Sequence, residues 1–210
     1  MINQLKYIYF DVGGVVILDY SKTNKWNEML KDLGITENQR PQFDQLFDTH
    51  EKKICCGEDI KVFVREAEKT LGIKFPQNYD MTSDFVNRFE LNPSMIALLG
   101  ELKGNIRLGL LTNQYPDLLN RIFQKGLLPK DVWDLIIDSS IVGIAKPDPR
   151  IYDLAEEKSG VEPASILFVD NKVKLLEYPK LKGWHVFEYD PANAFKSTDK
   201  LREYIYALIN

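Results

Sequence analysis

The stretch "YIYFDVGGVV", residues 7–16, decides the fold. Its aromatic and β-branched residues run without interruption to one carboxylate, Asp11, and Gly13 and Gly14 lie just beyond it. A continuous apolar run of this length is typical of a strand that is covered on both faces, as in a parallel sheet. A carboxylate at the end of such a strand costs free energy to bury. Asp11 is therefore the first candidate functional residue.

Four more short apolar runs follow this one along the chain. The five predicted strands span residues 6–11, 106–112, 135–138, 166–170 and 184–189. Between them, helices are predicted over residues 92–104, 116–126 and 148–160, and a last helix over 200–208. Asn-Pro and Asp-Pro pairs open two of these helices and glycines close all three inner ones. The alternation predicts an α/β fold with a doubly wound, mostly parallel, Rossmann-like sheet of five main strands.

Residues 19–90 do not follow this alternation. Their apolar residues recur at helical spacing in four segments, and no convincing strand lies among them. We therefore predict a four-helix cap over residues 19–90, inserted into a Rossmann-like core made of residues 1–18 and 91–210. His50 lies on one of the apolar helix faces, so we expect it to pack rather than to catalyse. Cys55 and Cys56, the only cysteines, are adjacent and are expected to be reduced thiols.

Composition narrows the classes of partner. The chain has 210 residues and a net charge of −4, which argues against a basic surface for nucleic acid. Its start lacks the pattern of a signal peptide, and no apolar run approaches the roughly 20 residues that span a bilayer. We expect a cytoplasmic protein that binds neither nucleic acid nor membrane, while its oligomeric state is left open.

Polar side chains occur where the predicted strands end. Asp11 and Asp170 end two strands, Thr112 ends another, and Lys146 precedes the helix that starts at Asp148. Each residue alone has an ordinary structural explanation as a cap, a turn residue or a solvated charge. In an open α/β sheet, however, ligands bind beyond the carboxyl ends of the strands. We therefore expect these four side chains to meet in one site.

This set of side chains suits a phosphate ester. Two carboxylates are hard oxygen ligands for Mg²⁺, which holds phosphate oxygens and offsets the charge repulsion between Asp11 and an anionic substrate. Lys146 adds a second positive charge, and Thr112 and the backbone N–H of Asn113 are placed to bind a phosphoryl oxygen. Asp11 could then attack phosphorus and form an aspartyl-phosphate.

With these motifs the chain resembles the haloacid dehalogenase-like hydrolase superfamily. Its four motifs occur in order as "FDVGGV", "LLTN", "AKPDPRIY" and "FVDN", and the helical insertion after the first resembles the family's helical cap. The most similar subgroup is that of the sugar-phosphate-phosphatase-like members. The "CCGEDI" turn around Gly57 lies where many members have a cap turn that faces the substrate. By this resemblance, Asp11 is the nucleophile, and Asp11, the carbonyl of Gly13 and Asp170 bind Mg²⁺.

The same resemblance assigns Thr112, Asn113 and Lys146 to the transferring phosphoryl group, and it implies a small phosphorylated metabolite as substrate. Most phosphatases of the family carry a second Asp two residues after the nucleophile, as the acid–base group. Here that position is Gly13, and Asn171 follows Asp170 where a further acid is common. General acid–base catalysis contributes about 10² to 10⁴-fold, so a slow enzyme is expected. Asp19 could substitute for the missing acid, or it could be a solvated turn residue.

Three other functions are compatible with the sequence. A catalytically weak or silent family member could bind a phosphorylated ligand or a partner protein. The absence of a carboxylate at Gly13 favours this alternative. A metal-independent 2-haloacid dehalogenase also lacks the second Asp, although it would not need the acid at Asp170. A phospho-receiver shares the Asp, Thr and Lys set but has no helical insertion.

Overall fold

A five-stranded parallel sheet forms the centre of the computed structural model, which describes residues 4–209. The strands lie in the order β5 (Leu135–Asp138), β4 (Arg107–Thr112), β1 (Tyr7–Phe10), β6 (Ile166–Asp170) and β7 (His185–Glu188). Each pairs in parallel with its neighbour, so all five carboxyl ends lie on one edge of the sheet. The first strand of the chain, β1, is the middle strand of the sheet. β4 and β5 lie on one side of it, and β6 and β7 lie on the other. The predicted doubly wound sheet is confirmed.

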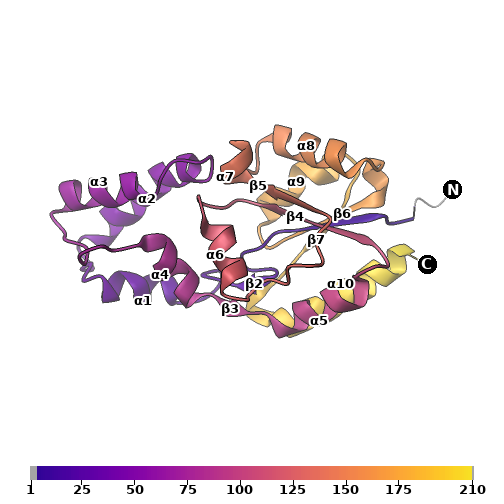
Figure 1. The fold of residues 1–210 in the computed structure, drawn as a ribbon, viewed down its shortest axis with the longest axis horizontal. Coiled ribbons are helices and arrows are strands. Elements are labelled where there is room, and N and C mark those ends of the chain that lie inside the picture. The colour runs from indigo at the N-terminus through magenta and orange to yellow at the C-terminus, as the bar shows by residue number, and fades with distance from the viewer. Residues whose placement is uncertain (1–3, 210) are drawn as a thin grey trace.

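Helices cover both faces of this sheet (Figure 1). Tyr7 and Tyr9 point to one face, where α8 (Pro149–Ser159) and α9 (Val173–Leu181) pack. Ile8 and Phe10 point to the other face and join the core of α5 (Pro93–Leu102) and α10 (Ala194–Ile209). Both faces of β1 are therefore buried, which explains why its sequence is apolar without alternation.

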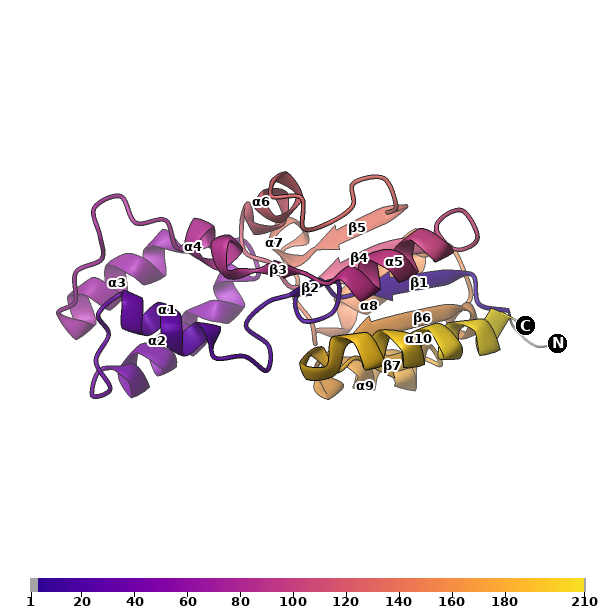
Figure 2. The same ribbon diagram turned by 90° about the horizontal axis from the view of Figure 1, so that it is seen from below.

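Four helices stand to one side of the sheet, beyond its carboxyl edge (Figures 1 and 2). They are α1 (Lys25–Asp32), α2 (Arg40–Ile54), α3 (Lys61–Leu71) and α4 (Met81–Arg88). In their shared core, Phe47 packs tilted against Trp26 and edge to face against Phe63 and Phe85. His50 is buried there between the carboxylates of two glutamates and against an aromatic ring, so it packs as expected.

The chain enters and leaves these helices through a two-stranded antiparallel neck. β2 (Ile17–Leu18) pairs with β3 (Glu90–Leu91), and Ile17 lies opposite Leu91. Two-residue strands are too short to show alternation, so the sequence did not predict them. The neck ties residue 18 to residue 90, on either side of the helical segment.

Several elements differ from their predicted bounds. The predicted helix at residues 116–126 is α6 (Leu118–Gln124), and α10 starts at Ala194, six residues before the expected start. α7 (Ser139–Val142) and α9 were not predicted. α9 contains Pro179, which ordinarily argues against a helix interior. Two 3₁₀ turns, Pro163–Ser165 and Pro191–Asn193, complete the described elements.

Within residues 4–209, no helix is both long and apolar enough to cross a bilayer. Cys55 and Cys56 are both free thiols, as predicted. Burial raises the pKa of the Cys55 thiol to about 12, so it remains protonated near neutral pH.

Candidate active site

Asp11 lies directly after β1, at the carboxyl edge of the sheet. Its backbone N–H donates to the carbonyl of Val169 on β6 at 2.9 Å, which continues the strand pairing by one residue. The hydroxyl of Thr112, at the end of β4, donates to Asp11 Oδ1 at 2.8 Å. Because β1 lies between β4 and β6, the ends of all three strands meet at Asp11.

Lys146 connects this carboxylate to a second one. Its Nζ lies 3.2 Å from Asp11 Oδ1 and 2.6 Å from Asp170 Oδ2, and all three side chains are buried. Burial acts to lower the pKa of Lys146, but the two carboxylates outweigh it and raise that pKa above its usual value. Burial raises the pKa of Asp170, against the opposing effect of Lys146. The structure thus brings together the three strand-end side chains and Lys146, the four that were expected to meet.

The loop that carries Lys146 is fixed by Asn113. The side-chain Nδ2 of Asn113 donates to the Lys146 carbonyl at 2.9 Å, and its Oδ1 accepts from the Lys146 N–H at 2.8 Å. This pair of bonds holds the loop against the end of β4. Asn113 was predicted to contact phosphate, and the structure gives its side chain this positioning role toward Lys146.

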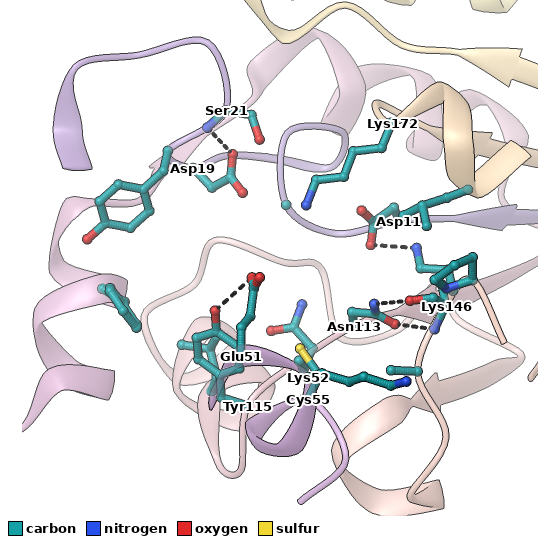
Figure 3. A pocket seen from close by; sticks show the side chains of 18 of the residues that line it. Asp11, Asp19, Ser21, Glu51, Lys52, Cys55, Asn113, Tyr115, Lys146 and Lys172 are labelled. Atoms are coloured by element: carbon teal, nitrogen blue, oxygen red, sulfur yellow. Dashed lines mark hydrogen bonds and ion pairs between the residues drawn. The ribbon is translucent and has the colours of Figure 1, made fainter. Parts of the chain in front are cut away.

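A cavity of about 1250 Å³ opens between the carboxyl edge of the sheet and the four helices (Figure 3). Asp11, Gly13 and Lys146 line its sheet side, while α2 contributes the opposite side. Its size exceeds the roughly 300–1,000 Å³ of ordinary ligand pockets. The side chains contributed by α2 and its C-terminal residue are Asp44, Phe47, Asp48, Glu51, Lys52 and Cys55.

Gly13 is partly exposed at this cavity, and the carboxyl group of Asp19 fills the space beside it. A Cβ atom built on Gly13 would lie 2.4 Å from Asp19 Oδ2 and 3.2 Å from its Cγ. Asp19 follows β2, and its Oδ1 accepts from the backbone N–H of Ser21 at 2.8 Å. Burial raises the pKa of Asp19, although the Ser21 hydrogen bond opposes this effect. Asp19 is therefore a partly buried residue that lines the cavity, rather than a solvated turn residue.

The donor set at the sheet edge fits a divalent cation of the hard, oxygen-binding kind. Asp11 and Asp170 present carboxylates from adjacent strands, with the backbone of Gly13 beside them. Among the described residues, three buried side-chain oxygens have no hydrogen-bond partner, on Tyr7, Gln114 and Asn171, and of these residues Gln114 lines the cavity. A buried acceptor in this condition requires a donor or a cation. The described residues contain no group of three or more His, Cys, Asp or Glu side chains arranged for a metal, so a cation here would also use carbonyl or amide oxygens.

The structure adds residues that sequence reasoning missed. Lys172 lines the cavity, and its backbone N–H donates to Asp170 Oδ1 at 2.8 Å. Figure 3 shows its side chain reaching toward the carboxyls of Asp11 and Asp19. Gln114 is buried and donates to the Thr112 hydroxyl at 2.9 Å. Tyr115 donates to Glu51 across the cavity at 3.3 Å. Lys172 and Gln114 each lie two residues beyond a strand-end residue, a signal that the sequence did carry.

Solved structures with the same fold include known members of one hydrolase family. A HAD-like family hydrolase from Porphyromonas gingivalis aligns with a TM-score of 0.74 at 20% identity, over 95% of this chain and 98% of that one. A HAD family enzyme of Bacteroides thetaiotaomicron, in complex with magnesium and inorganic phosphate, aligns with a TM-score of 0.69 at 18% identity, over 90% and 96% of the two chains. At these identities the likeness shows the shared fold.

Curated relatives match shorter segments. A phosphoserine phosphatase of Thermus thermophilus is 36% identical over 99 residues, which are 46% of this chain and 39% of that protein. An (S)-2-haloacid dehalogenase of Xanthobacter autotrophicus is 33% identical over 104 residues, 49% and 40% of the two. A pyrimidine 5'-nucleotidase of Escherichia coli is 38% identical over 69 residues, 32% and 30% of the two. The matches thus span less than half the length of these relatives. The model of the haloacid dehalogenase-like hydrolases matches residues 5–174, and the chain belongs to that family.

Proposed function

We propose that the chain is a Mg²⁺-dependent phosphomonoesterase that works through an aspartyl-phosphate on Asp11. The observation that carries this proposal is the placement of Asp11 at the base of the cavity. The buried ammonium of Lys146 and the hydroxyl of Thr112 both contact its Oδ1. A carboxylate fixed in this way by a cation and a hydroxyl is oriented for attack on an electrophile that enters the cavity.

In the proposed reaction, a carboxylate oxygen of Asp11 forms a bond to phosphorus while the bond from phosphorus to the ester oxygen breaks. Lys146 lies beside the attacking group and attracts the negative phosphoryl oxygens. The Asn113 backbone N–H would donate to those oxygens, and the Thr112 hydroxyl would turn its single proton from Asp11 to them once the substrate is bound. Water then cleaves the aspartyl-phosphate, which releases inorganic phosphate and restores Asp11.

The cation would be held by the carboxylates of Asp11 and Asp170, which follow or end adjacent strands, and by the carbonyl of Gly13. When bound, Mg²⁺ supplies positive charge that neutralises the phosphoryl oxygens as they approach Asp11. The magnesium and phosphate in the Bacteroides thetaiotaomicron enzyme support this assignment.

The substrate we propose is a small phosphorylated metabolite such as a sugar phosphate. The α2 side of the cavity mixes acidic, basic and aromatic side chains, which suits a leaving group with hydroxyls better than a purely apolar one. The names of two relatives, a phosphoserine phosphatase and a nucleotidase, also describe hydrolysis of small phosphate esters. The resemblance to sugar-phosphate phosphatases points to the same substrate class.

A panel of phosphorylated metabolites and 4-nitrophenyl phosphate, assayed with Mg²⁺, tests this function. We expect hydrolysis of at least one compound, and we expect Asp11→Asn to lower its rate by at least about 10³-fold, as loss of a nucleophile does. EDTA should reduce the wild-type rate to a similar level, and added Mg²⁺ should restore it. Equal rates for the wild type and Asp11→Asn would reject the mechanism.

Two observations favour competing functions. Gly13 carries no carboxyl, which favours a silent protein that binds phosphorylated ligands; such a protein would bind members of the panel without turnover. The (S)-2-haloacid dehalogenase of Xanthobacter autotrophicus is also a relative. A dehalogenase would release chloride from 2-chloropropionate without Mg²⁺. The buried Asp170 beside Asp11 favours the phosphatase, because a metal-independent reaction does not need a second acid there.

A further inference from the structure

The proposed reaction leaves a proton unassigned. When the bond from phosphorus to the ester oxygen breaks, an alkoxide leaving group needs a proton, and the later attack by water must release one. Neither Thr112 nor Lys146 serves this purpose, because both contact the nucleophile Asp11 directly. The proton therefore requires another acid that lines the cavity.

Most of the other carboxyl groups that line the cavity are committed elsewhere. Asp44 accepts from the indole N–H of Trp26, Glu51 from Tyr115, and Asp148 from Arg150. Asp48 is exposed on α2, on the side of the cavity opposite the sheet edge. Asp44, Glu51 and Asp148 are therefore held by hydrogen bonds to other side chains, and Asp48 lies on the side of the cavity opposite Asp11.

Asp19 differs from these groups. Its Oδ1 is bound by the Ser21 N–H, while its Oδ2 points to the place that a side chain on Gly13 would occupy. Gly13 is two residues from the nucleophile, so this carboxyl lies beside the turn that carries Asp11. Figure 3 shows the Asp11 and Asp19 carboxyls in the same part of the pocket, together with the Lys172 ammonium. Resting on the phosphatase function proposed above, we infer that Asp19 is a catalytic residue, the general acid and base of this site.

The proton balance is complete with this assignment. In the first step, Asp11 forms its bond to phosphorus, the ester bond breaks, and the Asp19 carboxyl gives its proton to the departing oxygen. The products are an alcohol, an aspartyl-phosphate and an Asp19 carboxylate. In the second step, Asp19 takes a proton from water as the water oxygen attacks phosphorus. The bond to Asp11 breaks, phosphate leaves, and both carboxyl groups return to their starting states.

The same geometry predicts what a side chain at Gly13 would displace. A Cβ at this position would lie 2.4 Å from Asp19 Oδ2, which is closer than real Cβ contacts. A side chain on Gly13 and the Asp19 carboxyl therefore cannot occupy this space at the same time. A Gly13→Asp substitution should therefore displace the Asp19 carboxyl and should not add a second acid. We expect no gain in rate from that substitution alone.

Asp19→Asn tests the assignment, because Asn keeps the shape and can still accept from Ser21. We expect kcat/KM for an alkyl phosphate, the substrate found in the panel, to fall by about 10² to 10⁴-fold. For 4-nitrophenyl phosphate the fall should be less than about tenfold, since nitrophenolate leaves without a proton. Water attack should then limit turnover, so a rapid burst of one nitrophenolate per active site should appear in the variant.

Two further variants complete the experiment. Asp59 makes the same bond to a backbone N–H two residues ahead, at 2.9 Å, and does not line the cavity. Asp59→Asn should therefore leave both substrates unaffected. Gly13→Asp combined with Asp19→Ala removes the steric conflict and returns a carboxyl to the same space. This double variant should regain part of the alkyl phosphatase activity that Asp19→Ala alone loses.

The outcomes distinguish failure of the Asp19 role from failure of the proposed phosphatase function. If the wild type hydrolyses nothing in the panel, the phosphatase proposal fails and the role of Asp19 fails with it. If the wild type is active but Asp19→Asn leaves it intact, or lowers kcat/KM equally for both substrates without a burst, the acid–base role is wrong while the phosphatase proposal stands.

Discussion

Lys146 is the residue on which the electrostatics of this site depend. Its side chain is fully buried, and its ammonium is shared by Asp11 at 3.2 Å and Asp170 at 2.6 Å. Removing one partner of a buried ion pair leaves an uncompensated charge, which is far more destabilising than losing a surface pair. The two carboxylates would repel each other across the sheet edge without it.

Lys146→Met should therefore destabilise the fold by about 3–5 kcal/mol, as loss of one partner from a buried pair does. The measurement is urea unfolding in EDTA, so that no divalent cation replaces the ammonium. Lys182→Met is the matched control, because Lys182 also contacts two acids, Asp153 and Glu156, but at the surface. That variant should lose less than about 1 kcal/mol. Similar losses in both variants would contradict the buried-charge argument.

The positions of the candidate site residues could be predicted from the sequence where strand ends determine them. Asp11, Thr112 and Asp170 follow apolar runs, and parallel strands bring their carboxyl ends to one edge. The position of Asp19 could not be resolved in this way. Its approach to Gly13 depends on the path of the neck, and a neck of two-residue strands leaves no pattern in the sequence.

Among the elements, the start of α5 holds the neck to the sheet. Asn92 is buried and caps this helix by accepting from the Met95 N–H. Its Nδ2 donates to the Val15 carbonyl at 2.8 Å and to the Tyr189 hydroxyl at 2.9 Å. One side chain thus joins the helix that follows β3 to the turn after β1 and to the end of β7.

Asn92→Ala should destabilise the protein by about 2–4 kcal/mol, because it removes a helix cap and leaves a buried carbonyl without its donor. Thermal or urea unfolding measures this change. Asn105→Ala is the control, since Asn105 donates only to the exposed Glu101 carbonyl at the other end of α5. Its effect should remain within about 0.5 kcal/mol. An Asn92 variant as stable as this control would show that the cap does not hold the neck.

Elements with strong apolar periodicity were predicted to within a few residues, and the exceptions have physical causes. The first turns of α10 contain Ser197 and Thr198, which are buried polar residues and break the apolar pattern. Ser197 accepts from the Asp190 N–H, and Thr198 bonds to Tyr189 and Ser94. These tertiary hydrogen bonds satisfy the buried polar residues in the first turns of α10, and sequence patterns do not reveal them.

For the whole molecule, the decisive feature is how the four helices sit on the carboxyl edge of the sheet. α6 contacts α4, where Arg121 pairs with Asp80 and Lys125 donates to the carbonyls of Val86 and Phe89. On the other side of the cavity, the turn after α2 meets the first turn of α7. The four helices thus meet the rest of the molecule at two places, α4 against α6 and the turn after α2 against α7 (Figure 1).

Gly57 lies in that turn, and its lack of a side chain lets the turn approach the backbone of α7 closely. Its φ of +105° is unfavourable for residues with a side chain, and a Cβ here would lie 2.9 Å from the Ser140 carbonyl oxygen. The neighbouring Cys55 lines the cavity, so a shift of this turn changes the cavity wall. Of the "CCGEDI" turn, Cys55 lines the cavity, and the expectation that the turn faces the substrate stays a prediction.

Gly57→Ala should push the turn away from α7, because the obstructing atom belongs to the backbone and cannot rotate aside. We expect kcat/KM to fall by about ten- to a hundredfold, since displacements near 1 Å have effects of this size. Gly72→Ala is the control: Gly72 also has a positive φ, +64°, but nothing lies within 4 Å of its Cβ position. Both variants should lose about 1–2 kcal/mol of stability from backbone strain. Only Gly57→Ala should lose activity, and equal activities in the two variants would mean that this contact does not shape the cavity.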